Sequence, residues 1–105
     1  MEFDFIASLK YRTTKDGGRK TPAKSGYRPQ VKFPFEVMTT SGQQIFLHKE
    51  MVNPGETIVA GIKMLSPGFF ENRLEEGMDF EFTEGSTIIG TGTIARLINV
   101  KLKKQ

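Results

Sequence analysis

Apolar and polar residues alternate with a period of two along most of the apolar segments of this chain. In the first of these segments, Phe3, Phe5, Ala7 and Leu9 lie on one side. A period of two places successive side chains on opposite faces of a β-strand, whereas a helix needs a period of 3.6. We therefore expect the chain to fold mainly as short strands, each with one face in the core.

The same alternation predicts further strands nearer the C-terminus. The sets that alternate are Ile58, Ala60, Ile62 and Met64, and then Met78, Phe80 and Phe82. Residues 88–102 are rich in Ile, Val and Thr, which predicts one bent strand or two pieces, with Gly90 and Gly92 allowing close backbone approach. The basic tail, residues 101–105, is expected to fray.

Turn signals separate these runs. They are DGG at 16–18, SG at 41–42, NPG at 53–55, SPG at 66–68 and EG at 84–85. Only residues 69–76 are compatible with a helical turn. Several short strands with regular turns and almost no helix are typical of a small antiparallel barrel or sandwich, and closure into a barrel removes exposed strand edges.

Length and composition bound the remaining possibilities. A chain of 105 residues predicts one domain, residues 1–105, with a single core. Cysteine is absent and there is one histidine, so we expect neither disulfides nor a metal site. The apolar runs are short and no signal sequence is present, which predicts no membrane contact and a cytoplasmic location.

Charge is unevenly distributed along the chain, whose net charge is +3. Lysines and arginines dominate the segment from Arg12 to Lys32, and carboxylates dominate the segment from Glu71 to Glu84. We expect these segments to form separate basic and acidic faces. A basic face favours polyanionic partners, although the same charges are equally compatible with a solvated surface that binds nothing.

Catalytic and nucleotide-binding motifs are missing. Residues 17–21, GGRKT, lack the phosphate-loop spacing because Arg19 interrupts the required Gly-Lys step. His48 has charged neighbours and is expected to face solvent. The carboxylates within residues 75–84 lack the spacing of a calcium loop and predict an outward strand face. We expect no enzyme, no catalytic residue, no nucleotide and no cofactor.

Residues 16–33, DGGRKTPAKSGYRPQVKF, form the most unusual segment. It is too long for one turn and too polar for a core strand. Pro22 and Pro29 restrict its path, and its lysines and arginines are able to meet phosphates without disturbing a core. The alternative is a long hairpin loop that lysines merely keep soluble.

Within this segment, GGRKTPAKSGYRPQ (17–30) closely resembles the GGRxTP…GYRPQ signature of domain III, the C-terminal barrel of bacterial elongation factor Tu. The resemblance continues in VNPG (52–55) and EGSTIIGTG (84–92), in the family's order and with roughly its spacing. It implies a six-stranded antiparallel β-barrel. Because the chain has no room for the factor's GTPase domain or middle barrel, we expect a stand-alone relative of domain III that is not a GTPase.

The resemblance also implies a surface for RNA, because domain III of the family touches the T-stem backbone of aminoacyl-tRNA. The expected RNA-binding residues are Gln30, Lys32, Ser41, Glu84 and Gly85. Ser41 matches a family hydroxyl, with Thr39 and Thr40 as alternatives, and Lys32 adds long-range attraction. Such contacts read backbone shape, so tRNA or another structured RNA is the expected partner, bound weakly.

A second use of the loop is implied by the packing of domain III against the GTPase domain in the full factor. A GTPase domain or another translation protein is then the partner. The expected interface residues are Gly17, Gly18, Arg19, Lys20, Tyr27 and Arg28. The alternative is that several of these residues brace the loop within the barrel.

Three positions depart from the family pattern. Thr87 replaces an arginine and Ser66 replaces a position that is often basic, so both lower the attraction for phosphate. Pro34 interrupts what is usually a strand, which predicts an edge position or a bulge near the RNA surface.

Overall fold

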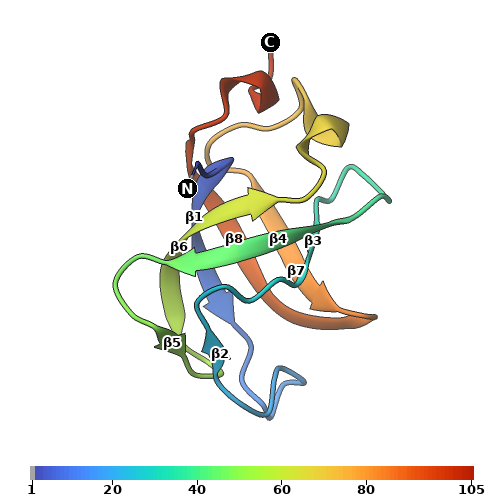
Figure 1. The fold of residues 1–105 in the computed structure, drawn as a ribbon. Coiled ribbons are helices and arrows are strands. Elements are labelled where there is room, and N and C mark those ends of the chain that lie inside the picture. Colours follow the sequence, from blue (N-terminus) through green and yellow to red (C-terminus); the bar gives the residue numbers. More distant parts are fainter. Residues whose placement is uncertain (1) are drawn as a thin grey trace.

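Six strands close into an antiparallel barrel in the computed structural model, which describes residues 2–105 (Figure 1). Their order around the barrel is β1-β6-β4-β3-β7-β8, and β2 and β5 form a separate two-stranded sheet. The strands are β1 (Phe5–Tyr11), β2 (Ala23–Lys24), β3 (Gln30–Lys32), β4 (Thr40–Phe46), β5 (Met51–Val52), β6 (Thr57–Met64), β7 (Asp79–Glu84) and β8 (Thr87–Leu97). Two 3-10 helices follow β6 and β8, namely η1 (Pro67–Phe70) and η2 (Val100–Leu102). The predicted all-β barrel is confirmed.

The barrel interior is filled by the inward faces that the alternation predicted. Phe5, Ala7 and Leu9 of β1 are fully buried. The ring centroid of Phe80 on β7 lies 5.6 Å from those of both Phe5 and Phe33, so three aromatic rings pack across the barrel. Burial of these rings supplies much of the hydrophobic free energy that holds the strands together.

Gly90 and Gly92 on β8 lie under aromatic rings from β7. A Cβ at Gly92 would overlap the ring of Phe80, and one at Gly90 would overlap Phe82 and the backbone of Lys10. The predicted close approach at these glycines is therefore confirmed, and it lets the rings of Phe80 and Phe82 pack against the backbone of β8.

Ser41 and Gly42 do not form the expected turn. Both lie inside β4, which pairs with β3 and β6. Gly42 is needed for packing, because a Cβ there would overlap the side chain of Val31 and crowd Ile62. The true connection between β3 and β4 is residues 33–39, which project from the barrel wall (Figure 1).

The C-terminal tail is ordered against the barrel, so the expectation that it frays is wrong. Leu102 is 1% exposed and closes one end of the core. The backbone NH of Leu74 donates to the carbonyl of Leu102 over 2.8 Å, and the NH of Lys104 donates to the carbonyl of Leu74 over 2.8 Å. One apolar residue within a basic run therefore anchors the tail.

Two smaller expectations also change. Pro34 lies beyond the end of β3, and β3 is paired on both sides, so Pro34 marks the end of a strand and neither an edge nor a bulge. The helical turn begins at Pro67, two residues before the expected segment, because the proline and the buried Phe70 define η1. Within residues 2–105, no helix has the length and apolar character needed to cross a lipid bilayer.

Candidate nucleic-acid interface

Polar side chains form a row across the outer wall of the barrel, at β4, β3 and β7. Gln30 lies directly opposite Ser41 of β4 on one side and Thr83 of β7 on the other. All three are partly exposed, while their strand neighbours Val31 and Phe82 are buried. Because opposed residues share one face of a sheet, the amide and the two hydroxyls gather on the outer surface. We call Gln30, Ser41 and Thr83 the polar row.

The donors of the polar row are available to a ligand. The side-chain Oε1 of Gln30 accepts a hydrogen bond from Thr39 Oγ1 at 3.0 Å, and the Gln30 NH2 group donates no hydrogen bond among residues 2–105. Across residues 2–105, no hydrogen bond engages the hydroxyl of Ser41 or that of Thr83. An amide and two hydroxyls side by side suit the 2′-hydroxyl and phosphate oxygens of an RNA backbone.

Glu84 is the last residue of β7 and Gly85 begins the turn to β8, directly after Thr83 of the polar row. Both are exposed, and Gly85 has φ 57°, the left-handed region that glycine adopts without strain. Glu84 is not free: its Oε1 accepts hydrogen bonds from the guanidinium of Arg19 and from the hydroxyl of Tyr27. The structure thus joins an expected RNA residue to two expected protein-interface residues.

Arg19 is the centre of this cluster and holds the long loop to the barrel. Its Nε donates to the carbonyl of Thr21 at 3.2 Å, and an Nη donates to the carbonyl of Pro22 at 3.4 Å. The Arg19 Cζ also lies 4.6 Å from the ring centroid of Tyr27, a cation–π contact. Arg19, Tyr27 and Glu84 are called the loop clasp below.

Burial and charge shift the pKa values of the loop clasp. Burial, together with the hydrogen bond to Glu84, raises the pKa of the Tyr27 phenol above its ordinary value of 10.0. Burial likewise raises the pKa of the Tyr11 phenol, which lies beneath the clasp and donates to the buried Oε1 of Gln44. Burial lowers the pKa of Arg19, but its contacts with Tyr27 and Glu84 outweigh this and raise it. The phenol of Tyr27 within the clasp and that of Tyr11 beneath it therefore stay neutral beside a charged guanidinium.

The six expected protein-interface residues separate into two groups. Gly18 lies against Arg12, where a Cβ would overlap backbone, so with Arg19 and Tyr27 it braces the loop. The other three, Gly17, Lys20 and Arg28, are exposed. The bracing alternative is therefore the better account of the first group, and only the second group offers free surface.

The expected separate basic and acidic faces do not form. Arg19 of the basic segment pairs with Glu84 of the acidic one, and Lys32 lies directly opposite Glu81. Strand pairing of β3 with β7 brings the two segments together, a long-range contact that charge counting along the chain does not reveal. Attraction for polyanions is thus confined to basic residues that have no carboxylate nearby.

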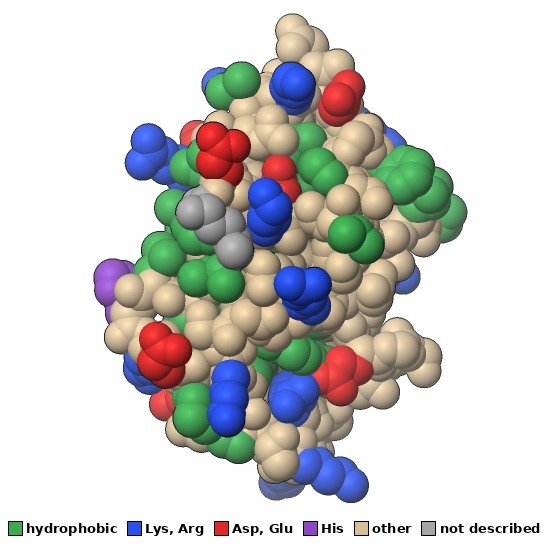
Figure 2. Space-filling view, viewed as in Figure 1, with side chains coloured by type: hydrophobic (Ala, Val, Ile, Leu, Met, Phe, Trp, Pro, Cys, Tyr) green, Lys and Arg blue, Asp and Glu red, His purple; other side chains and the backbone are tan. Residues whose placement is uncertain are grey.

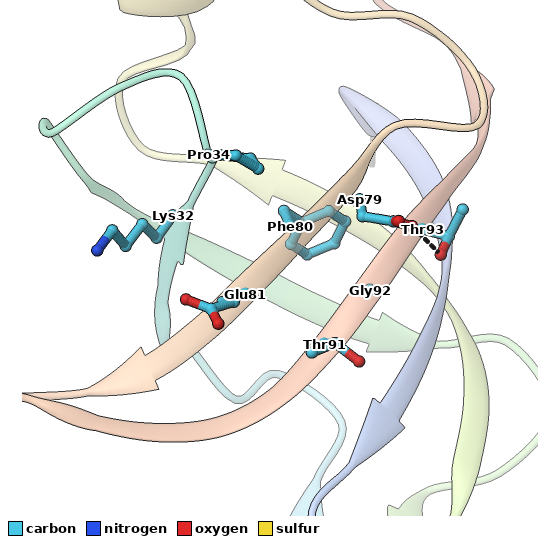
Figure 3. A pocket seen from close by; sticks show the side chains of 8 residues that line it. All are labelled: Lys32, Pro34, Asp79, Phe80, Glu81, Thr91, Gly92 and Thr93. Atoms are coloured by element: carbon cyan, nitrogen blue, oxygen red, sulfur yellow. Dashed lines mark hydrogen bonds between the residues drawn. The ribbon is translucent and has the colours of Figure 1, made fainter.

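A hollow of about 560 Å³ lies over β7 and β8, with Lys32 of β3 at its margin (Figure 3). Asp79 and Glu81 line it, with Lys32 at its margin pointing away from Asp79. The Oδ1 of Asp79 accepts a hydrogen bond from Thr93 Oγ1 at 2.7 Å. Two carboxylates at one opening repel phosphate, so this hollow does not extend the polar row as a nucleic-acid surface.

Other chemistry finds little support in the residues that the structure describes. Among residues 2–105, no three His, Asp or Glu side chains gather closely enough to hold a metal ion. His48 is exposed, as expected.

No protein-family model matches the chain. The barrel agrees with the fold that the motifs imply.

Three surface residues were missed by sequence reasoning. Thr83, Gln43 and Lys63 all face outward beside expected site residues. The alternation within β6 and β7 marks Lys63 and Thr83 as outward. The alternation does not indicate which strands are neighbours. The order of strands around the barrel is needed to find the residues beside Lys63 and Thr83.

Proposed function

We propose that this protein is a non-catalytic binding module, similar to domain III of elongation factor Tu, that contacts the backbone of structured RNA such as the tRNA T-stem. The observation that carries the proposal is the polar row, in which Gln30 is flanked on both sides by outward hydroxyls. These groups are suited to bond the 2′-hydroxyls that an RNA minor groove displays. Duplex DNA has no hydroxyl at its 2′ position.

The surroundings of the row favour an anionic partner. Lys32 continues β3 beyond Gln30, and Arg28 precedes it; both are exposed. Among residues 2–105, neither takes part in an ion pair. The charge of Arg28 is therefore free to attract phosphates, whereas Glu81, directly opposite Lys32, offsets part of the charge of Lys32. Positive charge that is not already paired releases counterions when RNA binds.

Glu84 has a defined place in this proposal. Because Arg19 and Tyr27 both bond to its Oε1, the clasp fixes the carboxylate at the end of β7, one residue beyond Thr83. A carboxylate there accepts from a 2′-hydroxyl and repels phosphate, which sets the register of the RNA and selects against DNA. The backbone NH of Gly85 beside it has no side chain to block its approach.

A protein partner is the second candidate, and the long loop carries it. Residues 12–22 project at the end of the barrel opposite to the C-terminus (Figure 1). Gly17 and Lys20 are exposed on this projection. A GTPase domain or another translation protein would dock here, as the GTPase domain of elongation factor Tu docks on its domain III.

Fluorescence titration of the protein with bulk tRNA, and with a DNA duplex of equal charge, tests the first candidate. We expect saturable binding of tRNA with a dissociation constant on the order of 10⁻⁴–10⁻⁶ M, and weaker binding of DNA. Replacing Gln30 and Ser41 together by alanine weakens tRNA binding, whereas Lys20→Ala does not. Equal affinity for tRNA and DNA, or loss only in the Lys20→Ala variant, contradicts the proposal.

A further inference from the structure

A small hollow of about 200 Å³ lies beside the polar row, between the loop and the outer face of β4 and β6. Its walls are Arg28, Ser41, Gln43, Lys63, Met64 and Leu65. Of these six, only Ser41 belongs to the polar row. Lys and Arg side chains lie over β4 and β6 on the face shown in Figure 2.

Backbone pairing explains why two cations meet at this hollow. The NH of Gly42 donates to the carbonyl of Pro29 at 2.9 Å, and the NH of Gln44 donates to the carbonyl of Tyr27 at 2.8 Å. Residues 27–29 thus continue the line of β3 beside β4, with the exposed Arg28 between these two bonds.

On the other side of β4, Gln43 lies directly opposite Lys63 of β6. Opposed residues in antiparallel strands have Cβ atoms about 5 Å apart, so the Gln43 side chain lies beside that of Lys63. The order across the surface is therefore Arg28, Gln43 and Lys63, with Ser41 two residues before Gln43 on the same face of β4. Two cations enclose an amide and a hydroxyl.

The polar groups of this hollow have no partners within the described chain, residues 2–105. Neither cation forms an ion pair there, and neither the hydroxyl of Ser41 nor the amide of Gln43 forms a side-chain hydrogen bond. No carboxylate lines the hollow. It therefore differs from the larger hollow over β7 and β8, where Asp79 and Glu81 repel anions.

Lys63 also borders a third hollow, which includes Glu2 and Asp4. The Asp4 carboxylate is already engaged, because its Oδ2 accepts from the NH of Met64 at 2.7 Å and its Oδ1 accepts from Asn99 at 3.0 Å. Glu2 is exposed and is not paired with Lys63 among the described residues. Lys63 forms no ion pair among the described residues, so its ammonium group is available to the hollow beside Gln43.

We infer that this hollow is a phosphate subsite, in which Arg28 and Lys63 neutralise one backbone phosphate while Ser41 and Gln43 donate hydrogen bonds to its oxygens. The inference rests on the proposed binding of RNA and adds a second contact to it. A strand that crosses the polar row then continues over β4 and β6, away from the carboxylates of β7. Leu65, which is 76% exposed, offers an apolar wall to the adjoining ribose.

The salt dependence of tRNA binding tests the subsite through two exposed residues, Arg28→Gln and Lys63→Gln, each made singly. Each variant removes one cation, so the slope of log K against log salt concentration falls by about one. Affinity falls about tenfold at about 50 mM salt and about threefold at about 200 mM. Lys10→Gln is the matched control, because Lys10 is exposed on β1, across the barrel from β3.

The outcomes separate the two proposals. Saturable tRNA binding with the same slope in Lys10→Gln and Lys63→Gln overturns the subsite and leaves the polar row as the RNA surface. If the protein binds no tRNA, a titration with inorganic phosphate tests the subsite. The amide resonances of Ser41 and Gln43 monitor the binding. Shifts that disappear in Lys63→Gln support an anion site that serves free phosphate, whereas absent shifts overturn it together with RNA binding.

Discussion

Arg19 and Glu84, 65 residues apart in the sequence, form an ion pair that fastens the long loop to the end of β7. The hydroxyl of Tyr27 shares the same carboxylate oxygen. The motif residues that suggest a protein contact are thus engaged inside the molecule, while the free donors lie on the wall at β3 and β4. The polar row, and not the pair Arg19 and Tyr27, therefore offers free hydrogen-bond donors to a partner.

Arg19→Ala should destabilise the protein, because it removes a cation–π contact, two hydrogen bonds to backbone carbonyls and a partly exposed ion pair. With the ion pair discounted for solvent screening, we expect a loss of about 1–2 kcal/mol in the free energy of unfolding. Urea denaturation measures it. The neighbouring Lys20→Ala is the control and should change stability little; equal losses in both variants contradict the clasp.

Gly42→Ala should also destabilise the protein, since a Cβ at Gly42 would overlap Val31 and crowd Ile62. Overpacking of this kind costs about 1–3 kcal/mol. Gly68→Ala provides the matched control, because the space around Gly68 is open and its φ is not positive. Thermal unfolding compares the two variants. A Gly42→Ala protein as stable as Gly68→Ala would show that residues 41–42 are a turn after all.

Leu102→Ala tests the anchored tail. Leu102 is 1% exposed, and truncating a buried leucine costs about 2–5 kcal/mol. Val100→Ala, two residues earlier, should have almost no effect because Val100 is 75% exposed. The two unfolding free energies, measured in urea, are expected to differ by at least about 2 kcal/mol. Similar values for both variants indicate a frayed tail.

The two tyrosines should resist ionisation in the folded state. The pKa values of Tyr11 and Tyr27 are both raised above 10.0. The neutral phenols therefore stabilise the fold fully below about pH 10, and this contribution is lost as the pH rises from there towards the folded-state pKa values. Ultraviolet absorbance of phenolate is expected to be nearly absent at about pH 11 in the folded protein and large in urea. Ionisation near pH 10 with intact circular dichroism argues against burial of the phenols.

Much of the barrel was predictable from the sequence, and the reason is local. The alternation around Phe5, Ile58 and Phe80 reports which side of each strand is buried, because burial on one face imposes a period of two. The strand containing Ser41 was missed because it has few apolar residues and a glycine that packs under Val31. A glycine within a strand and one at a turn look alike in sequence.

The candidate site was predictable only in part, for a different reason. Gln30 and Ser41 came from motif resemblance, and the pairing of β3 with β4 places them side by side. The contact between Arg19 and Glu84 depends on two segments meeting at one end of the barrel, which neither charge runs nor motifs specify. Lys63 became a candidate only when its strand partner Gln43 was known.

The most direct test of RNA binding at the polar row is to map amide resonances of the isotope-labelled protein while a tRNA T-stem hairpin is added. The account predicts shifts at Gln30, Ser41 and Thr83, and little change at the exposed loop residues Gly17 and Lys20. Shifts confined to the loop, or no shifts at concentrations up to about 10⁻³ M, well above the expected dissociation constant, would contradict it.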